Sequence, residues 1–138
     1  MVIETNIDDM NSEIYSYIIP KLLNKGALDV YLTNILMKKS RPAVKLSVLV
    51  NDEKKNDVIE QIFKETTTFG IRMYKVERDI LNRNFKEVNT KYGNVRVKEG
   101  VRNGDVLKTS VEYESAKRVA EENDIAIREV YDEVNKNI

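Results

Sequence analysis

Apolar and polar residues follow two different periods along the first part of the chain. Val2 to Ile7 is a short apolar run followed by the polar turn residues Asp8 to Asn11, which predicts a first strand. From about Glu13 to Lys25 the apolar residues instead recur every three to four positions, which predicts a helix with a broad apolar face. Gly26 is well placed to end that helix.

The next two runs favour strands again. Ala27 to Met37 is rich in residues that prefer extended backbone, and Val44 to Val50 alternates apolar with polar side chains. The basic turn Lys38 to Pro42 joins these two runs. Together they predict an antiparallel hairpin with a basic tip.

A second helix is expected after this hairpin, with Asn51 or Asp52 as its cap. It should end at Glu65 to Thr68, because three β-branched residues disfavour its continuation. Phe69 to Val76 then predicts a further strand. The order strand, helix, strand, strand, helix, strand is typical of the split βαβ arrangement of ferredoxin-like folds, with both helices on one face of an antiparallel sheet.

Residues 81–138 are expected to form an appendage to this sheet. A hairpin should turn at Lys91 to Asn94, another turn should follow at Asn103-Gly104, and two helices should end the chain. Ser110 is the expected cap of the first of these helices, and the second should begin near Ala126. We therefore expect an α+β fold in which residues 1–80 form a ferredoxin-like βαββαβ sandwich, and residues 81–138 form a β-hairpin and two C-terminal helices that pack on it as one compact unit.

The composition limits the chemistry. The chain of 138 residues has no His and no Cys, so a metal that it binds alone must take oxygen ligands, and neither a Ser–His nor a Cys–His nucleophile can form. Twenty-three basic residues balance twenty-three acidic ones, so we expect neither nucleic-acid nor membrane binding. The lack of Cys fits a cytoplasmic protein. No apolar run approaches the length that crosses a membrane.

The first candidate site is the acidic turn Asp8-Asp9, which lies between the first strand and the first helix. Carboxylates at this position can cap backbone N–H groups of the helix, or they can hold a hard cation beside a phosphate. The metal hypothesis gains from Glu4, Asn6 and Glu13, which can add oxygen ligands around Mg²⁺ or Mn²⁺. Both interpretations stay open on the residue types alone.

The second candidate site is the basic tip, with Lys38, Lys39 and Arg41. Such cations can simply keep a loop in solvent, or they can bind a triphosphate, for which Arg offers a bidentate fork. The phosphate hypothesis requires this tip to meet the acidic turn. In a ferredoxin-like sheet the two need not be adjacent within one subunit, so a subunit interface can be required, and we expect a homo-oligomer.

A third candidate is the loop that contains Thr66, Thr67 and Gly70. Its threonines can terminate a helix, or its hydroxyls and amides can contact a phosphate or a sugar where Gly70 permits a close approach. The chain contains neither a Walker A motif nor a dinucleotide-binding fingerprint, so a nucleotide site here would be unconventional.

Six segments, in order, resemble the C-terminal domain of the LarC family of nickel insertion proteins, which act in the biosynthesis of the lactate racemase cofactor. The resemblance covers essentially the whole chain. The segments are Glu4 to Asn11, Gly26 to Val30, Met37 to Pro42, Glu65 to Arg72, Tyr92 to Lys98 and Glu112 to Glu114.

This resemblance implies a CTP-dependent cyclometallase, a lyase that inserts nickel into a pyridinium bis-thiocarboxylate mononucleotide to form the nickel-pincer nucleotide. The family cleaves CTP to CMP and diphosphate with Mg²⁺ or Mn²⁺, and its C-terminal domain is the part associated with CTP. Asp8 and Asp9 would hold the divalent ion, while the basic tip and Arg72 would neutralise the triphosphate.

Two departures from the family pattern are visible. Ser12 stands where the family often has Pro, and Ser is tolerated at the start of a helix. The family's long N-terminal portion, with its potential nickel-binding residues, is missing, so we expect that portion as a partner, Ni²⁺ as a substrate of the full-length protein, and no nickel insertion by this chain alone. The alternative function is a non-catalytic, ferredoxin-like module for oligomerisation or binding.

Overall fold

The computed structural model describes residues 1–138, and the chain forms two compact units, Met1–Glu77 (unit 1) and Arg78–Ile138 (unit 2). This boundary lies close to the one expected between residues 80 and 81. Each unit has its own sheet, helices and buried core. That the second part packs on the first stays a prediction.

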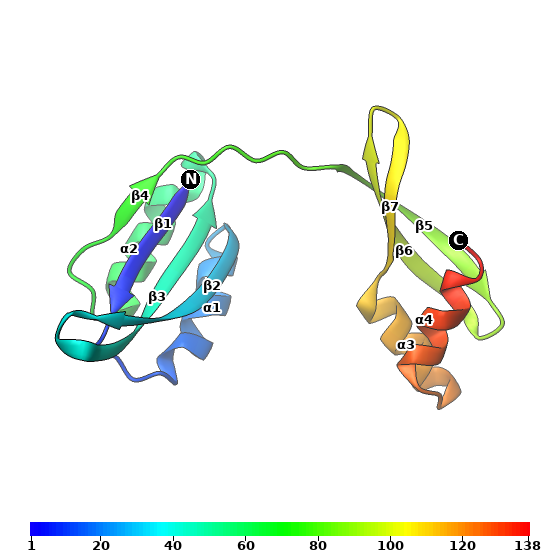
Figure 1. Ribbon diagram of the computed structural model, residues 1–138, viewed down its shortest axis with the longest axis horizontal. Helices are drawn as coiled ribbons and strands as arrows, with labels where there is room; N and C mark the ends of the chain where they lie inside the picture. Colours follow the sequence, from blue (N-terminus) through cyan, green and yellow to red (C-terminus); the bar gives the residue numbers. More distant parts are fainter. The chain divides into compact units, whose positions relative to one another are not determined.

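Unit 1 contains a four-stranded antiparallel sheet with the strand order β2-β3-β1-β4. Helices α1 and α2 lie on the same side of this sheet (Figure 1). The arrangement confirms the ferredoxin-like βαββαβ fold. In chain order the elements are β1 (Val2–Ile7), α1 (Ile14–Asn24), β2 (Ala27–Met37), β3 (Arg41–Val50), α2 (Lys55–Glu65) and β4 (Arg72–Tyr74).

The core of unit 1 lies between the sheet and the two helices. Alternate residues of the central strands point toward the helices, among them Ile3 of β1 and Val48 of β3, each at most 1% exposed. Ile18 and Leu22 meet them from α1, since residues four apart lie on one face of a helix. The residues that alternate with the core residues therefore lie on the opposite, open face of the sheet.

Two local expectations for unit 1 were wrong. The last strand is limited to Arg72–Tyr74, whereas Phe69 to Val76 was expected. The chain bends at Phe69, and the carbonyl of Gly70 accepts its hydrogen bond from the hydroxyl pair of Thr5 and Thr68. The second helix begins at Lys55 after a short 3₁₀ turn, and neither Asn51 nor Asp52 caps it through its side chain.

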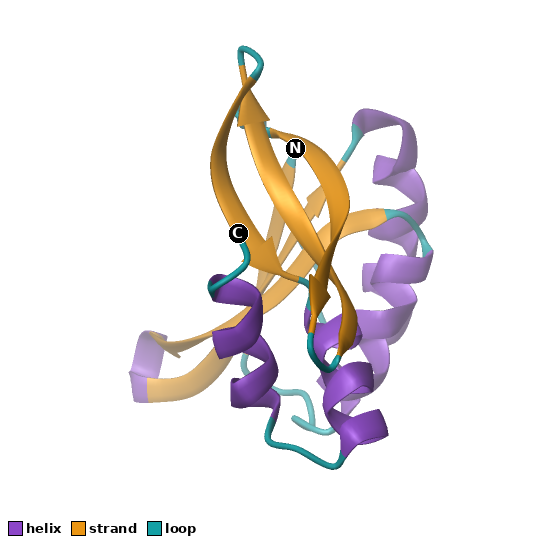
Figure 2. Ribbon diagram, turned by 90° about the vertical axis from the view of Figure 1, so that its right-hand side faces the viewer, coloured by secondary structure: helices purple, strands orange, loops and turns teal.

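Unit 2 contains a three-stranded antiparallel sheet with the order β5-β6-β7, packed against α3 and α4. The expected hairpin and two helices are present, and a third strand extends the sheet. Figure 2 shows the hairpin of β6 and β7 reaching beyond the part of the sheet that the helices cover. The elements are β5 (Asn82–Thr90), β6 (Gly93–Arg102), β7 (Asp105–Val111), α3 (Tyr113–Asn123) and α4 (Ile127–Asn135).

The core of unit 2 is small and aliphatic. Val95 and Val97 of β6 are fully buried against Val119 of α3 and Val130 of α4. The expectation that Ser110 caps α3 was wrong: Ser110 pairs with a residue of β6 inside the sheet, and the residue before the helix is Glu112. None of the four helices is long and apolar enough to cross a membrane.

Candidate functional site

The acidic turn after β1 and the basic tip between β2 and β3 meet within one chain. The Nη1 atom of Arg41 lies 3.3 Å from Oδ2 of Asp8. They are adjacent because β1 and β3 run antiparallel with Ile7 opposite Val44, so the end of β1 lies beside the start of β3. This corrects the expectation that a subunit interface can be required to bring the two turns together.

A cavity of about 400 Å³ lies beside this ion pair. Its volume is within the range of small-molecule sites. Asp8 contributes a charged edge, and most of the other lining side chains are apolar. The lining residues are Ile7, Asp8, Met10, Ser12 and Tyr15 from the β1–α1 segment, and Asn34, Ile35, Pro42, Ala43 and Val44 from the hairpin.

The second carboxylate of the acidic turn is held by the loop after α2. The hydroxyl of Thr67 donates a hydrogen bond to Oδ1 of Asp9. The same loop is fixed to β1, since the hydroxyls of Thr5 and Thr68 lie 2.6 Å apart, where one donates to the other and the second donates to the carbonyl of Gly70. The structure thus brings Asp8, Asp9, Arg41 and Thr67 to one end of the sheet.

The other two residues of that loop have different surroundings. The hydroxyl of Thr66 donates to the carbonyl of Ile62 at 2.8 Å and so ends α2, as the terminator hypothesis expects. Gly70 has no positive φ, and no atom lies within 4 Å of the position of a Cβ added there. The backbone at Gly70 is therefore open to a close approach from outside the chain.

Lys38 and Lys39 carry charges that no carboxylate of the chain neutralises within 4.0 Å, whereas Arg41 pairs with Asp8. Their turn is tight: Lys39 and Ser40 have φ values of 62° and 54°, which are uncommon for residues other than glycine. Such left-handed residues cost on the order of 1–3 kcal/mol each. The tip thus presents two unpaired cations on a strained turn.

Arg72 lies on the open face of the sheet and is already paired. Its Nε atom lies 3.2 Å from Oε2 of Glu4, and its Nη2 donates to Oδ1 of Asn6 at 2.6 Å. Much of its charge is therefore neutralised within the chain. Its expected contact with a triphosphate stays a prediction.

Sequence reasoning missed the cluster around Glu4. This carboxylate is only 7% exposed, and Lys45 lies 3.0 Å and the hydroxyl of Ser47 3.2 Å from its Oε1. Burial alone would raise the pKa of Glu4, but hydrogen bonds from Lys45, Arg72 and Tyr74 outweigh burial, so its pKa is lowered. The signal in the sequence was a single acidic residue inside a strand, and its partners become visible only with the register.

The donor set of the acidic turn suits a hard cation. Asp8 and Asp9 provide carboxylate oxygens, and no group of three or more His, Cys, Asp or Glu side chains gathers anywhere in residues 1–138. Mg²⁺ is commonly held by one or two carboxylates together with water and phosphate oxygens, so two carboxylates fit that ion. Glu4, an expected additional ligand, is instead engaged by two cations.

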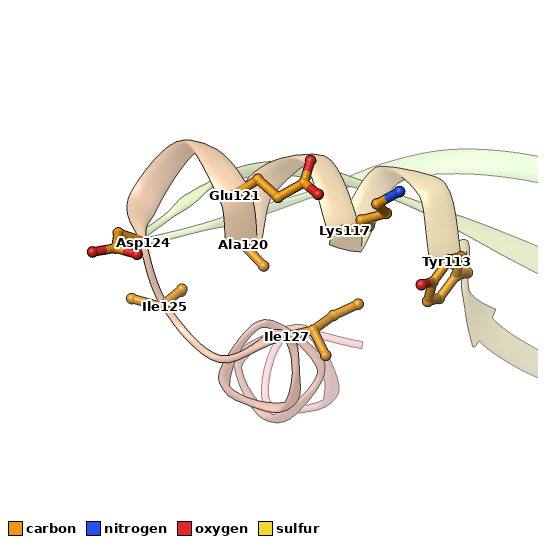
Figure 3. Close-up of a pocket in the computed structure, with 7 residues that line it drawn as sticks. All are labelled: Tyr113, Lys117, Ala120, Glu121, Asp124, Ile125 and Ile127. Atoms are coloured by element: carbon orange, nitrogen blue, oxygen red, sulfur yellow. The ribbon is translucent and has the colours of Figure 1, made fainter.

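Unit 2 has a groove of about 390 Å³ between α3 and α4. In Figure 3, Ala120 and Ile127 point toward each other, while Lys117 and Glu121 point away from Ile127. Charges of both signs line the groove, and none of the residues expected to form a site lies there. The end of the sheet in unit 1 is therefore the stronger candidate.

Comparison with known proteins agrees with this assignment of the fold. The chain is 40% identical to LarC2, described as the C-terminal domain of a cyclometallase involved in the synthesis of the NPN cofactor of lactate racemase; the TM-score is 0.93, and 99% of this chain and 94% of that chain are covered. A protein of Methanopyrus kandleri superposes with a TM-score of 0.73 at 26% identity, over 99% of this chain and 84% of that one.

Sequence relatives point the same way. The chain is 48% identical to the pyridinium-3,5-bisthiocarboxylic acid mononucleotide nickel insertion protein of Clostridium acetobutylicum over 98% of its own length, and 41% identical to the Thermotoga petrophila protein of the same name over 100%. It spans about a third of these relatives, 32% and 35% of their lengths. The sequence model of the nickel insertion proteins matches residues 1–131, and the chain belongs to this family.

Proposed function

We propose that this chain is the nucleotide-binding part of a nickel insertion enzyme, and that it binds CTP together with Mg²⁺ or Mn²⁺. The observation that carries the proposal is the meeting of Asp8 and Arg41 at the edge of a cavity of about 400 Å³. A divalent ion and a triphosphate require carboxylates and cations side by side, which this end of the sheet provides.

Each group has a distinct role in this proposal. Asp8 and Asp9 bind the divalent ion, and Thr67 orients Asp9 through its hydrogen bond. Arg41 holds the triphosphate with its planar fork, and the unpaired charges of Lys38 and Lys39 add electrostatic attraction. The open backbone at Gly70 is a secondary contact, and Thr66, whose hydroxyl donates to the carbonyl of Ile62, holds the loop in place.

The proposed reaction cleaves CTP to CMP and diphosphate, with water supplying the oxygen that the α-phosphate gains, while nickel enters the pyridinium bis-thiocarboxylate mononucleotide. The proposal uses no protein nucleophile, and the contribution of the chain is to position the phosphates and to stabilise the charge that develops on them. The divalent ion, when bound, supplies further charge stabilisation at the phosphate oxygens.

Nickel itself is the substrate and not a resident ion of this chain. Imidazole and thiolate are the ligands that suit Ni²⁺ in proteins, and the chain offers neither. The relatives are about three times as long as the segment they share with this chain. We therefore assign nickel handling to the N-terminal portion and expect the isolated chain to bind nucleotide without inserting nickel.

Calorimetry tests the proposal directly. CTP and ATP are titrated into the chain with and without Mn²⁺, and the expected result is binding heat that depends on Mn²⁺ and is larger for CTP. Equal, weak heats for CTP and ATP would contradict the specificity for CTP. CTP binding that is unchanged without Mn²⁺ would show that a divalent metal ion is not part of the site.

A second candidate function is a non-catalytic module for oligomerisation. It is favoured by β2, an edge strand of eleven residues without Lys, Arg or Pro. Long edge strands without such residues readily pair with another chain. Self-association without any nucleotide binding would favour this second function, whereas both properties together fit an oligomeric CTP-binding domain.

A further inference from the structure

Unit 2 carries a second pocket, on the face of its sheet that points away from α3 and α4. Residues opposite one another in the strands share a face of the sheet, so Arg83, Gly100 and Lys108 form one row, and Lys98 and Ser110 lie in the next. The core residues of β6 alternate with them and point toward the helices. The pocket over these two rows has a volume of about 350 Å³.

The charge in this pocket is positive and unpaired. The pocket is lined by Arg83, Lys98 and Lys108, and none of these three has a carboxylate within 4.0 Å. The neighbouring cations Lys86 and Arg102, by contrast, are each paired with a carboxylate. The acidic residue beside them, Glu99, pairs with Lys86 at 2.7 Å. The three cations therefore lack an internal counterion.

One wall of the pocket is apolar, and its shape depends on a glycine. A Cβ added at Gly100 would lie 2.7 Å from Cδ1 of Leu81, so the absence of a side chain lets Leu81 pack against the strand. Ile80, beside it, is 64% exposed and also lines the pocket. The result is a cationic surface that faces an aliphatic wall, with the hydroxyl of Ser110 on the same face of the sheet.

We propose that this pocket binds the phosphate group of a small organic molecule. Arg83, Lys98 and Lys108 neutralise the phosphate, and Ile80 and Leu81 contact the organic part. Arg and Lys are the residues that recognise phosphate in proteins, and the volume suits a mononucleotide better than a larger ligand. The site lies wholly within unit 2, so it shares no residue with the metal and triphosphate site proposed in unit 1.

A single-stranded nucleic acid fits this face less well. Such ligands need exposed aromatic rings on which bases can stack. This face of the sheet has one aromatic residue, Phe85, which is 47% exposed, and the guanidinium of Arg96 already lies over its ring, with Cζ 4.2 Å from the ring centroid. Arg96 in turn has Glu112 at 3.7 Å, which reduces its free charge.

Spectra of the ¹⁵N-labelled full chain test the proposal. The probe is nicotinic acid mononucleotide, and the control ligands are the matching riboside, which lacks the phosphate, and inorganic phosphate. The expected result is that the mononucleotide shifts the amide signals of Gly100, Lys108 and Ser110, that inorganic phosphate shifts them more weakly, and that the riboside does not.

Charge-neutral variants measure the contribution of each cation. Arg83→Gln and Lys108→Gln should each lower the affinity for the mononucleotide roughly tenfold, because each removes a charge-assisted contact to the phosphate. Arg128→Ala is the matched control, since this arginine is 89% exposed on α4 and does not line the pocket. Lys98→Gln replaces any variant whose spectrum shows misfolding. The Asp8→Asn variant should bind the mononucleotide as the wild type does, because Asp8 does not line this pocket.

Four outcomes would overturn the proposal. The first is that the riboside binds as well as the mononucleotide. The second is that the charge-neutral variants bind the mononucleotide with an affinity within a factor of two of wild type, and the third is that the signals shift only in unit 1. A single-stranded RNA oligomer that shifts these signals where the mononucleotide does not would also overturn it.

Discussion

Arg41 and Asp8 lie 33 positions apart in the sequence, and their side chains form an ion pair of 3.3 Å at the end of the sheet. Both are accessible, with side-chain exposures of 59% and 23%. Exposed ion pairs contribute about 0–1 kcal/mol to stability, since solvent screens them. Either partner can therefore be changed with little effect on folding, so that ligand binding reports on the site.

Asp8→Asn should lower the affinity for CTP in the presence of Mn²⁺ by roughly tenfold or more, because one of the two carboxylates available to the ion is lost. The free energy of unfolding should change by less than about 1 kcal/mol. Calorimetry and urea unfolding measure the two quantities. Asp57→Asn is the control, because Asp57 is exposed and lies 3.7 Å from Lys54 in a similar pair. An equal loss of affinity with and without Mn²⁺ would show that Asp8 does not act through the metal.

Arg41→Ala should lower CTP affinity roughly ten- to hundredfold, since a charge-assisted hydrogen bond to phosphate contributes about 1.5–3 kcal/mol. Arg41→Lys keeps the charge without the fork and should fall between wild type and Ala. The control is Lys64→Ala, which removes an exposed cation on α2. If Arg41→Ala binds CTP within a factor of two of wild type, the basic tip only serves solubility.

Stability should fall in acid through Glu4. Its pKa in the folded state is below the ordinary value of about 4.3, so the unfolded chain binds a proton first as the pH falls. The contribution of Glu4 is therefore fully present above that ordinary value and is lost as the pH falls through the lowered pKa. In urea unfolding between pH 7 and pH 3, the free energy of unfolding should fall less with decreasing pH for Glu4→Gln than for Glu53→Gln, a control at an exposed residue. Identical limbs would contradict the assignment.

Self-association should depend on the edge strand β2. Leu36 is 71% exposed and Leu32 38% exposed on this strand, and pairing with a second copy would cover them. Light scattering at micromolar concentration should show an oligomer for wild type and a smaller species for Leu36→Lys. Leu107→Lys in unit 2 changes a similarly exposed leucine and should leave the mass unchanged. A wild-type chain that is monomeric throughout would rule out this edge as an interface.

Local sequence patterns predicted the elements whose information is local. The bounds of β1 and β2 agree with expectation, because the polar turn after Ile7, Gly26 and the strand-forming residues of Ala27 to Met37 mark them. Ser110 is a favoured capping residue by type, yet the strand continues through it because it pairs with Lys98 on β6. That competition between a local preference and a pairing partner cannot be read without the register.

The candidate site was predictable in composition but not in arrangement. Asp8 and Arg41 were chosen by residue type, and their contact follows from the pairing of β1 with β3. Glu4 was considered as a metal ligand, but its partners Ser47 and Arg72 lie 43 and 68 positions away. Only the strand order β2-β3-β1-β4 places them around one carboxylate.

The cluster of Glu4, Lys45 and Arg72 also constrains how this surface can be re-engineered or can diverge. Replacing Glu4 alone leaves two cations facing each other without a counterion, while replacing either cation alone weakens the pairing of a carboxylate that is 7% exposed. Residues that share partners in this way have non-additive effects. A path from this charged face to an apolar one therefore passes through intermediates less stable than either end, so the three residues should be exchanged together.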